Sequence, residues 1–243
     1  MANYLPTKAI VVNSIKYGEN SRVLRCYTRE FGLQAYMINS VSSKKGVVKA
    51  GMLLPLTQLQ LVVTHKGKGT LERIKEAQID QHYHNIPVDP VRNALALFMA
   101  EVLSRTLKEE QPNADKFEFV HNYCSLLDTE QQIHSHFHIS FLLGLSRYLG
   151  FYPDQSSATS GNLFDMMEGR FVHANPLHPY CMTASCSESL KALLSGHASN
   201  DTIRIAKPVR RALLHDLLTY YRIHVEEFGQ LKSLEVLEEL FAN

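Results

Sequence analysis

The sequence contains no run of about 20 uninterrupted apolar residues, which is the length that a membrane-spanning helix needs. The most apolar helical candidate, residues 139–151, is interrupted by Ser140, Ser146 and Arg147. The N-terminal residues have neither the basic start nor the apolar stretch of a secretory signal peptide. We therefore expect a cytoplasmic protein that makes no contact with a membrane.

Cysteine is also scarce, since Cys26, Cys124, Cys181 and Cys186 are the four cysteines among 243 residues. This number is too small for a disulfide scaffold in a chain of this length, and thiols in the cytoplasm stay reduced. We expect most of these side chains to be buried and to pack as small apolar groups.

The motifs around which common active sites are built are missing. The sequence has no glycine-rich phosphate loop, no Gly-x-Ser-x-Gly elbow and no acidic cluster suited to two metal ions. Asp165 and Glu168 lie close together, but an isolated acidic pair is usually solvated surface. These absences favour a binding protein without a cofactor over an enzyme.

Four potential zinc ligands, His173, His178, Cys181 and Cys186, fall within fourteen residues. Structural zinc sites usually use ligand pairs held by tight turns, such as Cys-x2-Cys. His178 and Cys181 have this spacing, whereas four residues separate Cys181 from Cys186. We predict no metal site, and a zinc-dependent enzyme that uses these four residues is an alternative.

A second group of histidines, His134, His136 and His138, alternates along a segment of helical character. Neighbouring members of an alternating set point to nearly opposite sides of a helix. The spacing therefore argues against a metal site at these histidines.

The net charge of +1 conceals a strong difference between two parts of the chain. Residues 1–80 hold twelve Lys and Arg against five Asp and Glu, a net charge of +7, whereas the remainder carries −6. Such asymmetry is typical of a protein whose basic part binds a polyanion. The charge distribution therefore predicts a nucleic-acid partner for the N-terminal part.

The first eighty residues form short segments, several rich in β-branched or aromatic residues, and turn formers separate them. The expected strands are residues 9–12, 23–28, 33–38, 53–63 and 70–79. Five short strands with no long helical pattern between them fit a small closed barrel, which leaves no exposed sheet edge. We expect this barrel to form an N-terminal domain of residues 1–82.

The pattern changes at a proline-rich hinge near residues 86–90, after which apolar residues recur at helical spacing. Asp89 is expected to cap the first helix, with Pro90 at its first position. Later helices are expected at residues 117–127, 137–149, 204–225 and 234–241. The predicted fold class is α+β, with a mainly α-helical C-terminal domain of residues 83–243 and an irregular insert around residues 154–187.

Basic residues are distributed through the strands and loops of the predicted barrel. If the barrel brings them onto one face, they would form a groove complementary to phosphates, and binding would weaken steeply with added salt. Interleaved aromatic side chains would either stack on bases or fill the barrel: Tyr17, Tyr27, Phe31 and Tyr36. The candidate nucleic-acid-binding residues are Lys16, Arg22, Arg25, Arg29, Lys44, Lys45, Lys49, Lys66 and Lys68.

Several short motifs follow one another in an order that one family shares. They are YGENSRVL at residues 17–24, YTREFG at 27–32, KK at 44–45, LPL at 54–56, LGFYP at 149–153, RIAK at 204–207 and LKSLE at 231–235. Each motif is weak alone, but together they span nearly the whole chain. In this order the sequence resembles the RecO family of recombination mediators.

The resemblance implies an OB-fold barrel and a DNA-binding mediator of DNA repair and homologous recombination that is not an enzyme. It implies binding to single- and double-stranded DNA and annealing of complementary strands. It also implies a complex with RecR, which would help load RecA onto DNA coated with single-strand-binding protein. The barrel would bind DNA and RecR, and the protein would be cytoplasmic and nucleoid-associated.

In the same family the helical domain would bind the C-terminal tail of single-strand-binding protein, which has an apolar end and acidic residues. A pocket for such a tail needs apolar walls and a cationic rim. Four cations fall within eight residues on a predicted helix: Arg204, Lys207, Arg210 and Arg211. They are candidates for that rim, and the alternative is ordinary charge on a helix surface.

The sequence departs from the family in one respect. Many members carry a zinc-binding cysteine quartet after the Leu-Gly-Tyr-x-Pro segment, whereas residues 154–172 here contain no cysteine. We therefore expect apolar side chains to hold this region together: Phe164, Met166, Met167 and Phe171. Because OB-folds accept RNA as well as DNA, an RNA-binding factor is a further alternative.

Overall fold

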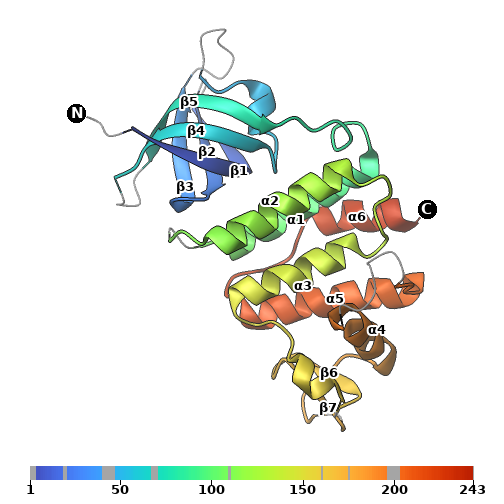
Figure 1. Cartoon of the computed structure of the whole chain (residues 1–243). Coiled ribbons are helices and arrows are strands. Elements are labelled where there is room, and N and C mark those ends of the chain that lie inside the picture. Colours follow the sequence, from blue (N-terminus) through green and yellow to red (C-terminus); the bar gives the residue numbers. More distant parts are fainter. Residues whose placement is uncertain are drawn as a thin grey trace. The chain divides into compact units, whose positions relative to one another are not determined.

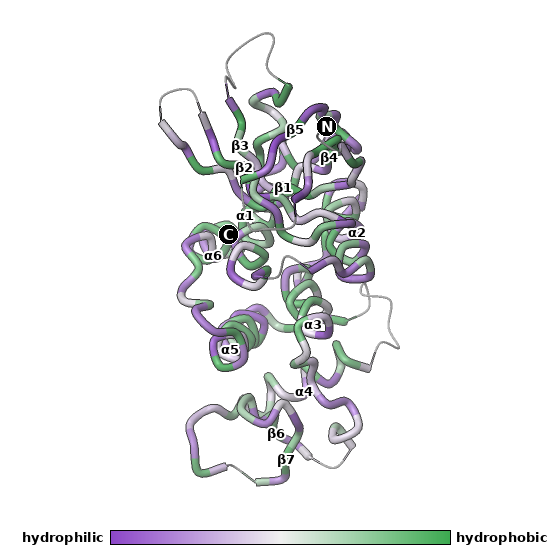
Figure 2. The backbone as a smooth tube through the Cα atoms, turned by 90° about the vertical axis from the view of Figure 1, so that its left-hand side faces the viewer, coloured by the Kyte–Doolittle hydropathy of each residue, from purple (hydrophilic) through white to green (hydrophobic). Residues whose placement is uncertain are grey.

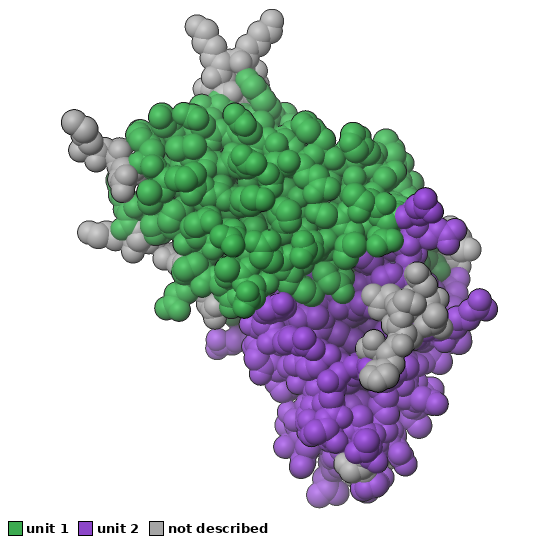
Figure 3. All heavy atoms as spheres, in the orientation of Figure 1, with its two compact units in different colours: residues 1–130, 230–243 green, residues 131–229 purple. Residues whose placement is uncertain are grey.

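The computed structural model describes residues 4–18, 21–39, 47–66, 71–108, 111–159, 161–174, 176–195 and 203–242 (Figure 1). The chain forms two compact units (Figure 3). Unit 1 comprises residues 1–130 and 230–243, and unit 2 comprises residues 131–229. Within the described ranges, no helix is long and apolar enough to cross a membrane. The domain boundary expected between residues 82 and 83 stays a prediction.

Five strands close into a barrel in unit 1. They are β1 (Tyr4–Tyr17), β2 (Ser21–Thr28), β3 (Gly32–Asn39), β4 (Gln58–Thr64) and β5 (Glu72–Gln81). Their order around the barrel is β1-β2-β3-β5-β4, and β1 pairs with both β2 and β4. All pairs are antiparallel except β3–β5, which is parallel. This mixed five-stranded barrel, followed by helices, confirms the predicted fold class.

β1 is longer than the predicted strand at residues 9–12 because it pairs with two neighbours. Residues 4–10 pair with β4, and residues 9–17 pair with β2. A register shift between Val11 and Asn13 marks a bulge close to the overlap of the two ladders. Polar residues interrupt the apolar pattern on both sides, so the local sequence marks only the middle of this strand.

The predicted fourth strand, residues 53–63, begins too early. Ala50–Leu53 form a short 3-10 helix, η1, and Leu56 has a positive φ of 63°. A strand needs extended backbone with negative φ, so the turn at Leu56 delays the start of β4 to Gln58.

Inward-facing side chains of the strands form the barrel core. Leu24 and Cys26 of β2 lie inside with Tyr36 of β3, because alternate residues of a strand point to the same side. Burial raises the pKa of the Cys26 thiol above its ordinary value. Cys124 and Cys186 are also buried, which confirms that most of the cysteines pack as apolar groups.

Three helices belong to the same unit as the barrel: α1 (Pro90–Thr106), α2 (Ala114–Thr129) and α6 (Ser233–Ala242). Asp89 accepts hydrogen bonds from the backbone N–H groups of Val91 and Arg92, and Pro90 opens α1, as predicted. On the barrel, Tyr27 donates to the carbonyl of Asn113 at 3.3 Å, just before α2 begins.

A carboxylate of α1 anchors the start of α6. Glu101 of α1 accepts hydrogen bonds from the backbone N–H of Lys232, at 3.1 Å, and from the N–H and hydroxyl of Ser233, at 2.8 and 2.7 Å. Partial burial raises the pKa of Glu101, but the hydrogen bonds from Ser233 and Lys232 outweigh this and lower it overall. The last helix of the chain is therefore anchored to the first.

A buried network fixes the hinge between the barrel and α1. The Asp128 carboxylate of α2 accepts hydrogen bonds from three successive backbone N–H groups, of residues 84–86. The Arg92 guanidinium donates to the carbonyls of Leu127, Asp128 and Glu130, at 2.5, 3.3 and 2.6 Å, and so caps the C-terminus of α2. Burial raises the pKa of Asp128, but the three backbone donors bring it below its ordinary value.

Unit 2 is built around α3 (Phe137–Leu149), α4 (Ala184–Leu194) and α5 (Lys207–His224). Tyr220 and Tyr221 of α5 donate to the carbonyls of Phe151 and Leu142, each at 2.6 Å. Hydrophobic and hydrophilic residues alternate along α5, as expected for a helix with one buried side (Figure 2). The helix starts three residues after the predicted position at 204, with Pro208 in its first turn.

The predicted irregular insert contains regular structure. It holds the 3-10 helix η2 (Gln155–Thr159), the hairpin strands β6 (Leu163–Asp165) and β7 (Arg170–Val172), and the start of α4. Phe164 and Phe171 pack edge to face with ring centroids 5.1 Å apart, and Met166 is buried. Met167 is exposed, so its predicted place in this small core is wrong. Strands of three residues are too short to show an alternating pattern.

Candidate functional site

One face of the barrel carries exposed apolar and cationic side chains together. Strand register places Ile15, Val23, Met37 and Arg73 opposite one another across β1, β2, β3 and β5. Paired residues of neighbouring strands share a face of the sheet, so these side chains form one continuous row. Ile15 is 55% exposed, which identifies this face as the outer surface. Val23 and Met37 are half-buried, and Arg73 is exposed.

Two further side chains extend this row, because residues two apart in a strand share a face. Tyr17, at the end of β1, is 61% exposed, and Arg25 lies half-buried in β2. Opposite Arg25, the amide of Asn13 donates to the Ser104 hydroxyl of α1 at 3.0 Å, so α1 borders this surface. We call Ile15, Tyr17, Val23, Arg25, Met37 and Arg73 the β2–β3 face.

The β1–β2 hairpin carries two cations at the end of the barrel, on the opposite side of the strands from Ile15 and Val23. Lys16 and Arg22 are direct cross-strand partners, and like charges in this position repel each other. The Arg22 side chain is held by the hydroxyl and carbonyl oxygens of Ser14, at 2.7 and 3.2 Å. A bound anion would relieve the repulsion between the two cations.

The structure places the other predicted nucleic-acid-binding residues differently. The Arg29 guanidinium lies 2.7 Å from Glu118 and 3.4 Å from Glu30. The hydrogen bonds that it donates to Glu118 first, and to Glu30 second, raise its pKa. Its charge is therefore already compensated by carboxylates. Lys49 and Lys66 are exposed, next to η1 and after β4. Lys44, Lys45 and Lys68 lie outside the described residues.

Of the interleaved aromatic residues, Tyr27 and Tyr36 are buried and Tyr17 is exposed. Phe31 is partly buried and stacks on His65 with ring centroids 4.2 Å apart. The aromatic residues therefore mostly fill and stabilise the barrel. Arg73 was not among the predicted site residues, because only the parallel pairing of β3 with β5 brings it beside Met37.

The surface over β1, β4 and β5 has the opposite character. A hollow of about 400 Å³ there has apolar walls from Pro6, Leu61 and Val62, and its polar groups are Glu30, Glu76, Gln60, Gln78 and Lys8. The Lys8 ammonium lies 3.3 Å from the carboxylate of Asp80. This acidic and amide-rich surface would repel phosphates, so the charge of the barrel favours the β2–β3 face for a polyanion.

In unit 2 a hollow of about 360 Å³ lies beside the start of α5. Its apolar walls are Ile133, Ile203 and Ile205, and Arg204 and His134 supply polar groups. The combination of apolar walls with a cation matches the requirement for an apolar, acidic peptide end.

Among the four cations predicted as a rim, Arg204 lines this hollow and the others lie along α5. Lys207 and Arg211 are exposed, whereas Arg210 is half-buried and donates to the carbonyl of Ile205 at 3.4 Å. Burial lowers the pKa of Arg210 from its ordinary value. The structure therefore brings Arg204 to the hollow and gives Arg210 a contact with its wall.

The three alternating histidines do not act alike. His134 and His136 both line the hollow, with ring centroids 4.4 Å apart, whereas His138 is buried within α3. Burial, followed by the nearby charge of Arg210, lowers the pKa of His138 to about 3, so this ring is neutral at physiological pH.

The potential zinc ligands of the insert have other partners. The His178 ring lies 3.3 Å from the Asp165 carboxylate, and Cys186 is buried at the start of α4. Cys181 is partly exposed, and its pKa is raised by burial and then by the charges of nearby carboxylates. Among the described residues, no three His, Cys, Asp or Glu side chains are grouped so that they could hold a metal ion.

Comparisons with known proteins cover nearly the whole chain. The family models described as "Recombination protein O N terminal" and "Recombination protein O C terminal" match residues 1–83 and 87–235. The DNA repair protein RecO of Flavobacterium psychrophilum is 38% identical over 241 residues, which is 98% of this chain and 99% of that protein. The proteins of the same name from Christiangramia forsetii and Phocaeicola vulgatus are 35% and 32% identical, each covering 97% of this chain and 98% of the relative.

This similarity confirms the family resemblance of the ordered motifs, since it runs through both the barrel and the helices. The chain belongs to the RecO family of DNA repair proteins, which are recombination mediators and not enzymes.

Proposed function

We propose that this protein binds single- and double-stranded DNA through the β2–β3 face, anneals complementary strands and acts as a recombination mediator in DNA repair. The observation that carries the proposal is the row Ile15–Val23–Met37–Arg73, flanked by Tyr17 and Arg25. OB-folds bind oligonucleotides on this part of the barrel, between the loops that follow the first and fourth strands.

The two kinds of side chain on this face have different tasks. Arg25 and Arg73 on this face would neutralise phosphates of the DNA backbone. Lys16 and Arg22, which point to the other side of the two strands, would contact phosphates that pass around the end of the hairpin. Tyr17 and Ile15 would lie beneath unstacked bases, which offer the same flat surface whatever their identity. This division suits a mediator that binds DNA regardless of sequence.

Salt dependence tests the proposal directly. The logarithm of the association constant for a labelled single-stranded oligonucleotide should fall with the logarithm of salt concentration with a slope of about −3. Each of roughly four neutralised phosphates contributes about −0.7 to that slope. A slope near zero in fluorescence anisotropy titrations would refute the proposal, and stronger competition by a matched RNA would favour the RNA-binding alternative.

Tyr17 offers a second test. Replacing Tyr17 with Ala should weaken single-stranded DNA binding by about 1–3 kcal/mol, because one base loses its stacking surface. Double-stranded DNA, whose bases stay stacked, should be affected less. The matched control is Tyr4→Ala at the far end of β1, where the ring lies 5.1 Å from the Lys75 ammonium. Equal losses in both variants would contradict a stacking role for Tyr17.

We further propose that the hollow in unit 2 binds the C-terminal tail of single-strand-binding protein. The apolar end of the tail would enter between Ile133, Ile203 and Ile205, and its carboxylates would meet Arg204. Lys207 and Arg211 lie at the N-terminal end of α5, where the helix dipole also favours anions. The family further implies a complex with RecR at the barrel, an indirect role in loading RecA, and a cytoplasmic location at the nucleoid.

Arg204→Ala should lower the affinity for a labelled peptide of this tail about 10- to 100-fold, because a charge-assisted hydrogen bond contributes roughly 1.5–3 kcal/mol. Arg222→Ala, an exposed cation at the other end of α5, is the matched control and should change the affinity less than about twofold. Isothermal titration calorimetry distinguishes the two variants. Equal effects would indicate general charge attraction instead of a pocket.

A further inference from the structure

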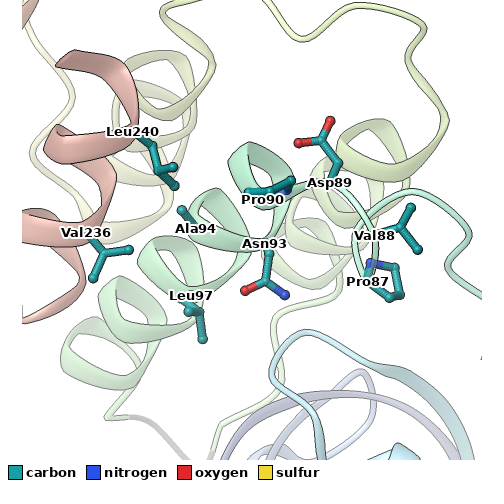
Figure 4. A pocket seen from close by; sticks show the side chains of 9 residues that line it. All are labelled: Pro87, Val88, Asp89, Pro90, Asn93, Ala94, Leu97, Val236 and Leu240. Carbon is teal, nitrogen blue, oxygen red and sulfur yellow. The ribbon is translucent and has the colours of Figure 1, made fainter. Parts of the chain in front are cut away.

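We propose that a groove between α1 and α6 of unit 1 is a docking site for a basic, apolar segment of a partner protein. The groove has a volume of about 310 Å³, and its walls come from both helices and from the turn before α1 (Figure 4). Ala94 and Leu97 of α1 and Val236 and Leu240 of α6 border the same space.

Large apolar side chains are exposed at this groove. Val88 is 75% exposed, Val236 48% and Leu97 42%. Single exposed apolar residues are common on soluble proteins, but a contiguous patch around a groove is typical of an interaction site. The described surface therefore offers an apolar partner a place to bury its own side chains.

The groove exists before any partner binds. Asp89 caps the start of α1, and Glu101 fixes the first turn of α6 through the N–H groups of Lys232 and Ser233. Both walls are thus held by hydrogen bonds that the partner does not have to create. A preformed groove lowers the cost of ordering on binding.

The spacing of the apolar side chains indicates the shape of the partner. Ala94 and Leu97 are three residues apart, and Val236 and Leu240 are four apart, so each pair lies on one side of its helix. Two such stripes beside a groove suit an amphipathic helix that inserts its apolar side between them.

The charge at the rim indicates the chemistry of that helix. Glu235 and Glu239 are exposed on α6, each directly before a residue of the groove. Asp89 lies on the other wall, where its carboxylate is 3.3 Å from the Arg92 guanidinium, so the uncompensated acidic charge comes from α6. The sequence of α6 contains no Lys or Arg. The nearest cation in the sequence is Lys232, which directly precedes the helix and lies one turn before Val236. The acidic excess is therefore greatest toward Leu240, which favours Lys or Arg on the partner and disfavours both DNA and an acidic tail.

The test uses two designed amphipathic peptides of about 18 residues, long enough for five helical turns. They share one leucine-rich side, and their polar sides carry either Lys or Glu. With the full-length protein, the Lys peptide should bind at least tenfold more tightly than the Glu peptide in fluorescence anisotropy. Equal affinities, or no binding of the Lys peptide, would overturn the proposal.

Leu97→Asp separates docking from simple charge attraction. The added carboxylate should lower the affinity for the Lys peptide at least tenfold if the Leu97 side chain is part of the docking surface. It would strengthen binding if only charge mattered, and that result would overturn the proposal. Leu126→Asp is the matched control, because Leu126 is an exposed leucine of α2 that does not line the groove.

Two further measurements distinguish docking of a partner protein from DNA binding and from self-association. DNA affinity should be unchanged in Leu97→Asp, so a failure here leaves the DNA-binding proposal untouched, and circular dichroism checks that the variant is folded. Sedimentation velocity without peptide tests a second copy as the occupant. Self-association that Leu97→Asp abolishes would overturn the choice of a partner protein.

Discussion

Replacing Arg25 and Arg73 together with Glu is expected to lower the affinity for single-stranded DNA at least a hundredfold at about 0.1 M salt. Both cations lie on the β2–β3 face, so the change removes two phosphate contacts and adds two repulsive charges there. The slope of the logarithm of the association constant against the logarithm of salt concentration should also become less negative by about 1.4, since each phosphate contact contributes about −0.7 to it. Anisotropy titrations at several salt concentrations measure both effects.

The control carries the same change in charge at cations that already have carboxylate partners. Lys8 lies 3.3 Å from Asp80, and Arg29 lies 2.7 Å from Glu118. The Lys8→Glu, Arg29→Glu protein should lose less than about tenfold in affinity, and its salt dependence should change little. If both double variants lose affinity equally, the net charge of the barrel governs binding and the β2–β3 face has no special role.

The second large effect is on stability. Arg92→Met should lower the free energy of unfolding by about 3–5 kcal/mol, the cost of removing one partner from a buried charged network. The variant leaves three carbonyls at the C-terminus of α2 without their donor. For a protein of this size the melting temperature should fall by roughly 6–20 °C, at about 2–4 °C per kcal/mol.

Arg105→Met is the control for this prediction. Its exposed guanidinium lies 4.0 Å from the partly buried Glu101 on the same helix, and a long ion pair that water reaches contributes less than about 1 kcal/mol. Urea titrations followed by circular dichroism measure both variants. A loss below about 1 kcal/mol in Arg92→Met would show that solvent or neighbouring donors replace the guanidinium.

Local chemistry made parts of this fold predictable. The start of α1 follows from Asp89 and Pro90, because an N-cap and a proline act within their own turn. The three-residue strands around Phe164 and Phe171 could not be predicted, since they also depend on hydrogen bonds with residues 180–187, later in the chain. The turn at Leu56 could not be predicted either, since a single backbone angle determines it.

The candidate sites also combine features that the local sequence predicts with features that depend on distant contacts. Charge distribution along the sequence predicted a basic barrel, but the row from Ile15 to Arg73 depends on pairings among four strands. Nothing in the local sequence of β3 or β5 predicts that these two strands pair in parallel. Likewise, the density of cations marked the start of α5, but the hollow beside Arg204 also needs residues 132–136 from a segment far away in the chain.

The anchoring of α6 by Glu101 makes unit 2 an insertion within unit 1, since the chain leaves unit 1 after residue 130 and returns at residue 230. A single protease cut anywhere in residues 131–229 would leave unit 1 as two polypeptides joined only by their noncovalent contacts. Folding of unit 1 from those fragments would then be a bimolecular reaction, and its yield would rise with fragment concentration. The chain could accordingly be divided there into two complementing halves, one of which contributes only a short C-terminal helix to unit 1.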